Sequence, residues 1–215
     1  MIEDLAALNS WNFNIFDYDL NKSNSFAIIM MEEALEPLGV EYEPNILRTF
    51  VSRVKHGYRP SNPYHKWEHG LSVMHIAYMM TSAGGVGTYL PPLDKFAVLV
   101  ASVGHDIGHP GTNNTFEVNK NIYPGASSDL ALCYNDQSVL ENYHAARTCE
   151  IMQDPRSALL TPFEQDQKKD IRRMVILGIL GTDMNQHKVM LDSLKDRFAH
   201  KKFFRAHTTF TCKLF

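Results

Sequence analysis

The sequence predicts an all-α protein, and three observations support this fold class. Apolar residues recur at helical spacing through most of the chain, Pro and Gly interrupt these segments, and no segment shows the strict apolar–polar alternation of a half-buried strand. Neither an internal repeat nor a polar linker divides the 215 residues. We therefore expect one compact multi-helix domain with a substantial core.

The first half of the chain contains four predicted helices. Apolar positions at helical spacing indicate helices over residues 25–38 and 67–80. Proline at the first helical position supports two more, over residues 44–56 and 92–105. A glycine-rich stretch at 84–87 is expected to separate the last two.

The second half continues the helical pattern after a gap. Residues 119–128 resemble a surface loop, and residues 138–153 are again periodic. The stretch TPFE (161–164) has the pattern of a capping box with proline at the first helical position. It predicts a helix that starts there and runs to about residue 182, and a further helix is expected over 185–197.

Composition and charge argue against several classes of protein. The net charge is −3 and no basic cluster exceeds Lys201-Lys202, so a nucleic-acid partner is not expected. No apolar run approaches the ~20 residues that cross a bilayer, and the start MIEDLAALNSW lacks the regions of a signal peptide. Three scattered cysteines are expected to stay reduced, which predicts a cytoplasmic protein.

The apolar run at 98–104 ends in His105-Asp106, and His109 follows four residues after His105. Burying a carboxylate without a partner is costly, so Asp106 is expected to face a metal ion, a basic side chain or solvent. The plain structural alternative is a helix end whose carboxylate caps a neighbouring helix. The choice between them depends on what else lies nearby.

Metal-binding side chains occur in four stretches near predicted helix ends. These stretches are PYHKWEH (63–69), HDIGH (105–109), YNDQSVLENYH (134–144) and GTDMNQH (181–187). A pair of histidines four residues apart is weak evidence alone, since ten histidines produce such pairs by chance. Taken together, imidazole and carboxylate groups suit zinc, manganese, iron or magnesium.

The motifs resemble those of the class I 3',5'-cyclic nucleotide phosphodiesterases, within the wider HD group of metal-dependent phosphohydrolases. The matching segments are NPYHKWEH (62–69), GHDIGHPGTNN (104–114), YNDQSVLEN (134–142) and GTDMNQH (181–187). They occur in the family's order. The resemblance implies an HD-type helical catalytic domain that hydrolyses cAMP or cGMP to a nucleoside 5'-monophosphate in cyclic-nucleotide signal transduction.

The resemblance also implies a role for each matching residue. His65 matches the general acid that protonates the leaving O3' of the ribose. A tightly held zinc is implied at His69, His105 and Asp106. Asp106 is further expected to bridge to a second divalent ion, Mg²⁺ or Mn²⁺.

The remaining implied roles concern water, the general acid and the substrate. Residues that match those holding metal-bound waters or orienting the general acid are His109, Glu141 and His144. Residues that match the substrate pocket are Tyr64, Thr182, Asp183 and Met184. Glu141 is expected beside His65, where its charge would raise the pKa of that imidazole.

The sequence also departs from the family pattern. The family's ENHH reads ENYH here (141–144), and no later aspartate matches the fourth zinc ligand. We expect residues 1–198 to form a partial catalytic domain that lacks its C-terminal helices, and 199–215 to be a divergent tail. Besides an active phosphodiesterase, two other functions therefore remain open. One is an inactive remnant that acts by protein interaction in a homo- or hetero-oligomer. The other is an HD-type phosphohydrolase that acts on non-cyclic nucleotides.

Overall fold

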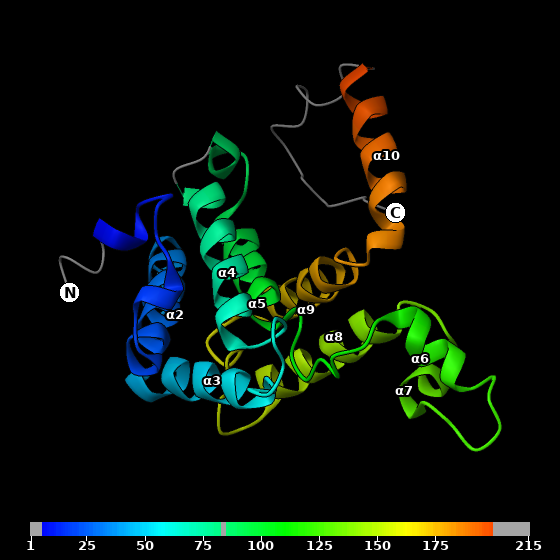
Figure 1. Ribbon diagram of the computed structural model, residues 1–215. Coiled ribbons are helices and arrows are strands. Elements are labelled where there is room, and N and C mark those ends of the chain that lie inside the picture. Colours follow the sequence, from blue (N-terminus) through cyan, green and yellow to red (C-terminus); the bar gives the residue numbers. More distant parts are fainter. Residues whose placement is uncertain (1–5, 83–84, 200–215) are drawn as a thin grey trace. The chain divides into compact units, whose positions relative to one another are not determined.

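The computed structural model describes residues 6–82 and 85–199, and every regular element within these ranges is a helix (Figure 1). The α-helices are α2 (Leu20–Leu35), α3 (Pro44–Gly57), α4 (Trp67–Ser82), α5 (Pro92–Gly104), α6 (Asn114–Lys120), α7 (Asp129–Cys133), α8 (Val139–Gln153), α9 (Gln165–Leu180) and α10 (His187–Ala199). The 3₁₀ turns are η1 (Ile15–Asp17), η2 (Glu36–Leu38), η3 (Gly85–Thr88) and η4 (Met184–Gln186). The predicted all-α fold is confirmed.

The chain divides into two compact units, Met1–Leu180 and Gly181–Phe215. The first contains α2 to α9, and the second contains η4 and α10. The predicted boundary at 198/199 falls at the edge of the described residues, so the expected divergent tail lies almost wholly outside them. Among the helices of the described ranges, none combines the length and apolar character that a bilayer crossing requires.

Helix α5 lies at the centre of the first unit and contacts α2, α4, α8 and α9 (Figure 1). Its sequence explains this position, because apolar residues occur on most of its sides and such a helix is stable only when it is surrounded. Phe96, Val100 and Val103 are fully buried. Each such side chain contributes about 1.5–3 kcal/mol to the free energy of unfolding. The packing fixes the C-terminal end of α5, which leads directly into His105 and Asp106.

Two predicted helix starts were wrong, in opposite directions. Helix α2 begins at Leu20, earlier than expected, because the Asp19 carboxylate accepts a hydrogen bond from the Lys22 N–H at 2.8 Å and caps the first turn. Helix α9 begins later, at Gln165, where the Glu164 N–H donates to Gln167 Oε1 at 3.0 Å. This bond lies at the start of α9, three residues further along the chain than the predicted capping box.

The late start of α9 has a cause in the core. Phe163, inside the predicted capping box, is buried against Phe96 with ring centroids 5.6 Å apart and faces Tyr42 edge-on. This packing keeps residues 154–164 in turns, so burial of one aromatic ring overrides a local capping signal.

The predicted surface loop at 119–128 overlaps the end of a short helix, α6, and residues 121–128 connect it to a second short helix, α7; the periodicity indicated neither helix. Helix α6 starts after Asn113, whose side chain accepts from Phe116 N, and α7 starts after Ser128, whose hydroxyl accepts from Ala131 N. Both helices are too short for a periodic apolar stripe, so only these capping residues could have indicated them.

Candidate metal centre

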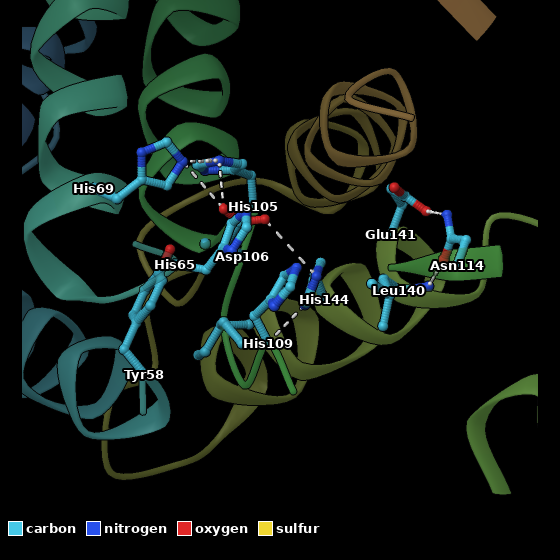
Figure 2. Close-up of polar contacts among 12 residues, drawn as sticks. Tyr58, His65, His69, His105, Asp106, His109, Asn114, Leu140, Glu141 and His144 are labelled. Carbon is cyan, nitrogen blue, oxygen red and sulfur yellow. Dashed lines mark hydrogen bonds and ion pairs between the residues drawn. The ribbon is translucent and has the colours of Figure 1, made fainter. Parts of the chain in front are cut away.

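The start of α4 and the end of α5 bring His69, His105 and Asp106 together (Figure 2). Asp106 Oδ2 lies 3.1 Å from His69 Nε2 and 3.2 Å from His105 Nε2. The two Nε2 atoms are themselves 3.2 Å apart. Three donor atoms from two helices therefore converge on one point, as the sequence analysis expected.

Backbone carbonyls orient two of the imidazoles. Nδ1 of His105 lies 2.7 Å from the Ser102 carbonyl, and Nδ1 of His144 lies 2.8 Å from the Ile107 carbonyl. A carbonyl only accepts, so each Nδ1 carries the proton and donates it. Each Nε2 is thereby presented to Asp106, which is the usual arrangement behind a histidine that ligates a metal.

The charge balance at Asp106 indicates a site for a cation. Its side chain is only 13% exposed, and this burial acts to raise its pKa. Hydrogen bonds from His105 and His69 outweigh burial and hold the pKa of Asp106 well below its usual range. Burial likewise opposes protonation of His105, yet the hydrogen bond and the charge of Asp106 raise the pKa of that imidazole. The buried carboxylate thus stabilises protons on the neighbouring imidazoles. A divalent cation that displaced these protons would compensate the same negative charge.

A second group of donors forms on the other side of Asp106. Ligand atoms of Asp106, His109 and His144 lie within 4.8 Å of one another, and Asp106 Oδ1 is 3.9 Å from His144 Nε2. Burial is the main cause that lowers the pKa of His109 and of His144, to about 4 in each case. Both imidazoles are therefore neutral at pH 7. His144, whose Nδ1 donates to a carbonyl, has a free Nε2 lone pair, whereas His109 accepts from the Gly111 N–H at Nδ1 and is suited to hold water through Nε2–H.

The carboxylate of Asp106 is common to the two groups. Oδ2 faces His69 and His105, while Oδ1 faces His144 (Figure 2). The donor set of imidazoles around a shared carboxylate fits a pair of divalent cations.

His65 lies beside these groups and stacks on His109. The two ring centroids are 3.8 Å apart and the planes differ by 7°. Tyr64 contacts the same region from outside, with its ring centroid 5.0 Å from that of His65 and 4.5 Å from that of His69. Tyr64 is 61% exposed, so this residue borders the centre and is open to solvent.

Glu141 does not have the predicted effect on His65. The pKa of His65 is lowered, with burial as the largest cause, and the charge of Asp106 opposes this only in part. Glu141 projects from α8 on the far side of His144, where its Oε2 accepts from Asn114 Nδ2 at 2.8 Å (Figure 2). The same Asn114 accepts from Leu140 N through Oδ1, so it anchors the first turn of α8. The expectation that Glu141 raises the pKa of His65 was wrong.

The predicted pocket residues Thr182, Asp183 and Met184 belong to the second unit. Asp183 precedes η4 and caps it, since its Oδ1 accepts from Asn185 N at 2.9 Å. Met184 is exposed. Within their own unit these residues form a capped turn that leads into α10.

Sequence reasoning missed several residues that hold the centre in place. The Tyr58 hydroxyl donates to the Val103 carbonyl at 2.9 Å, three residues before Asp106. Gly70 allows this approach, because a Cβ there would lie 2.5 Å from the Tyr58 hydroxyl oxygen. The hydroxyl of Thr148, on α8, donates to the Gly104 carbonyl at 3.1 Å.

Comparison with known proteins agrees with this geometry. The family model described as 3'5'-cyclic nucleotide phosphodiesterase matches residues 64–213. The 3',5'-cyclic-nucleotide phosphodiesterase regA of Dictyostelium discoideum is 36% identical over 180 residues, which cover 84% of this chain and 22% of that protein. A dual specificity calcium/calmodulin-dependent 3',5'-cyclic nucleotide phosphodiesterase 1 of Drosophila melanogaster is 31% identical over 196 residues, covering 89% and 23%.

Among solved structures, the phosphodiesterase domain of the RhoPDE fusion protein from the choanoflagellate Salpingoeca rosetta superposes with a TM-score of 0.81 at 30% identity. The superposition covers 94% of this chain and 62% of that one. The chain thus spans less than two thirds of the solved domain and about a fifth of the two relatives named above. The family match over residues 64–213 and the shared helical fold lead to one conclusion: the chain belongs to the 3',5'-cyclic nucleotide phosphodiesterase family, which is metal-dependent, in agreement with its own His–Asp cluster.

Proposed function

We propose that this chain hydrolyses 3',5'-cyclic nucleotides to nucleoside 5'-monophosphates. The observation that carries the proposal is the pair of donor groups that share Asp106. A cyclic phosphodiester is anionic and repels an incoming oxygen nucleophile. Cations placed on both sides of one carboxylate are suited to overcome that repulsion.

We propose zinc at His69, His105 and Asp106, and Mg²⁺ or Mn²⁺ on the side of Asp106 that faces His109 and His144. Two imidazoles and one carboxylate suit zinc, whereas the second ion would use Asp106 and water held by the neighbouring histidines and by Glu141. When bound, these ions supply activation of the nucleophile and neutralisation of charge on the phosphoryl oxygens.

His65 is the proposed proton donor. As a water oxygen forms a new bond to phosphorus, the bond from phosphorus to O3' breaks, and the departing alkoxide takes the proton of His65. The attacking water releases one proton to solvent, and His65 regains a proton from solvent before the next turnover. The pKa of His65 is lowered in the free protein. Contact with the phosphate anion would favour the protonated ring, because an opposite charge raises an imidazole pKa. Substrate binding itself would then charge the donor.

The proposed substrate contact in the first unit is Tyr64, beside His65. For Thr182, Asp183 and Met184, in the second unit, a substrate contact is proposed from the family resemblance alone. The exposed aromatic face of Tyr64 adjoins the imidazoles.

The test is turnover of cAMP and cGMP by the full chain with Zn²⁺ and Mg²⁺, followed by release of the 5'-monophosphate. The His65→Gln variant should lose about 10²–10⁴-fold in kcat, because it removes a general acid, while bound zinc stays unchanged. Tyr42→Phe is the matched control, since Tyr42 bonds to the Leu159 carbonyl outside the centre. Zinc-loaded protein without turnover above that of His65→Gln would contradict the proposal.

A second candidate is the inactive chain that acts by association. The observation in its favour is on α10, where Val189, Met190, Leu191 and Leu194 are all exposed. Exposed apolar side chains on one helix are typical of a docking surface for another helix. Sedimentation of the purified chain, alone and with a longer family member, would show dimers or mixed complexes if this surface binds.

The cytoplasmic location predicted from the cysteines stays a prediction.

A further inference from the structure

We infer that Asn62 is a positioning residue for the reaction proposed above, on which this inference rests. Its side-chain amide joins the backbone of His65 to the backbone of His109. It thereby sets the stacking of the two imidazoles.

The amide contacts are specific. Asn62 Nδ2 donates to the His109 carbonyl at 2.8 Å and to the His65 carbonyl at 3.1 Å. Both amide hydrogens are therefore used, each on the main chain of a different histidine. Asn62 is buried, so no solvent replaces these bonds if they are lost.

The other end of the amide is also enclosed. A Cβ on Gly111 would lie 3.3 Å from Asn62 Oδ1, which places that oxygen against the turn after His109. In the same turn, the Gly111 N–H donates to His109 Nδ1 at 3.0 Å. The His109 ring is therefore fixed at its own nitrogen, and its backbone is fixed by Asn62.

His65 depends more strongly on Asn62. It lies in the irregular segment between α3 and α4, where residues 58–66 form turns and bends rather than a regular helix. Asn62 is itself held in this segment by its N–H, which donates to the Arg59 carbonyl at 3.1 Å. The bond from Asn62 to the His65 carbonyl thus links a turn of the segment to the residue that carries the proposed proton donor.

The stacking geometry follows from these backbone bonds. The His65 and His109 rings are nearly parallel, at 7° and 3.8 Å. A single ring contact is too weak to order an irregular segment, whereas two buried hydrogen bonds to main-chain carbonyls can do so. Displacement of a proton donor by about 1 Å costs about 100-fold in rate, so the position of the segment matters for turnover.

The test compares the full zinc-loaded chain with Asn62→Asp, which keeps the shape of the side chain but replaces both donors by an oxygen that repels the two carbonyls. Tyr42→Phe is the control, because it also removes a hydrogen bond between distant segments, from the Tyr42 hydroxyl to Leu159 O. The first readout is the NMR shift of the ring protons of His65 and His109, assigned with His65→Gln. Each of two stacked rings shifts the proton resonances of the other upfield. Asn62→Asp should therefore move the ring-proton resonances of both histidines downfield, toward the chemical shifts of unstacked imidazoles, while Tyr42→Phe should leave them unchanged.

The second readout is kinetic. Asn62→Asp should lower kcat about 10- to 100-fold with KM and bound zinc unchanged, because His65 and His109 move while the proposed zinc ligands do not bond to Asn62. If Asn62→Asp does not fold, Asn62→Ser removes the same bridge without adding charge. Folded variants that keep the stacked ring shifts would overturn the inference. A wild-type chain with stacked rings but no turnover would defeat the proposed function alone, since the ring shifts still test Asn62.

Discussion

Gly104, the last residue of α5, has no room for a side chain, and this makes a sharp prediction. In an ordinary helix interior, Gly→Ala stabilises a protein by about 1 kcal/mol. Here a Cβ would lie 2.3 Å from Thr148 Oγ1 and 2.7 Å from Thr148 Cγ2. Thr148 is fully buried on α8 and cannot turn aside. Overpacking of this kind costs about 1–3 kcal/mol, so Gly104→Ala should reverse sign and destabilise the protein by up to about 2 kcal/mol.

The matched variant is Thr148→Ala, which removes both clashing atoms and leaves Cβ as the nearest, at 3.1 Å. Alone it should cost about 1–2 kcal/mol, because the hydrogen bond to the Gly104 carbonyl is lost. In the Thr148→Ala background, Gly104→Ala should cost nothing further or stabilise the protein. The assay is urea unfolding of all four proteins, followed by circular dichroism. Equal effects of Gly104→Ala in both backgrounds would refute the close approach of α5 and α8.

Three further predictions follow from the same structure. Asp106→Asn should lose most bound zinc after dialysis, as measured by mass spectrometry, because it removes the charge shared by both donor groups; retention of a full zinc would contradict this. Tyr58→Phe should lower the free energy of unfolding by about 1–2 kcal/mol, because a buried hydrogen bond to the end of α5 disappears; an unchanged urea midpoint would argue against that bond. Hydrogen bonds and charge from Arg156, together with the charge of Arg53, hold the pKa of Asp154 below its usual range, so the stability it contributes is present above about pH 4 and is lost as the pH falls below that value. The difference in unfolding free energy between wild type and Asp154→Asn should therefore shrink from pH 7 to pH 3, and a constant difference would exclude this origin.

The elements that sequence reasoning predicted well have long apolar patterns. Helix α5 was recognisable because its apolar run is continuous and ends abruptly in His105 and Asp106. The convergence of His69 on the same point agrees with the family motif that contains it. Patterns of this length reflect burial, which decides whether a helix forms.

The features that sequence reasoning missed depend on distance in space. Nothing local indicates that Tyr58 reaches the end of α5, or that the Asn114 amide donates to Glu141. The start of α9 was displaced because Phe163 is drawn into the core, an effect of residues far away in sequence. Spacing along the chain shows which groups can share a face, but packing decides which neighbour each one meets.

Helix α8 has a further consequence for how this protein acquires its structure. Its His144 and Thr148 bind carbonyls 37 and 44 residues earlier in the chain. Tyr143 lies against the turn at Gly108, where a Cβ would come within 2.8 Å of its ring. Contacts between such widely separated residues form slowly during folding. We therefore expect the histidine-bearing turn to be among the last parts of the first unit to gain protection in pulsed hydrogen exchange, after α4 and α5 have already paired.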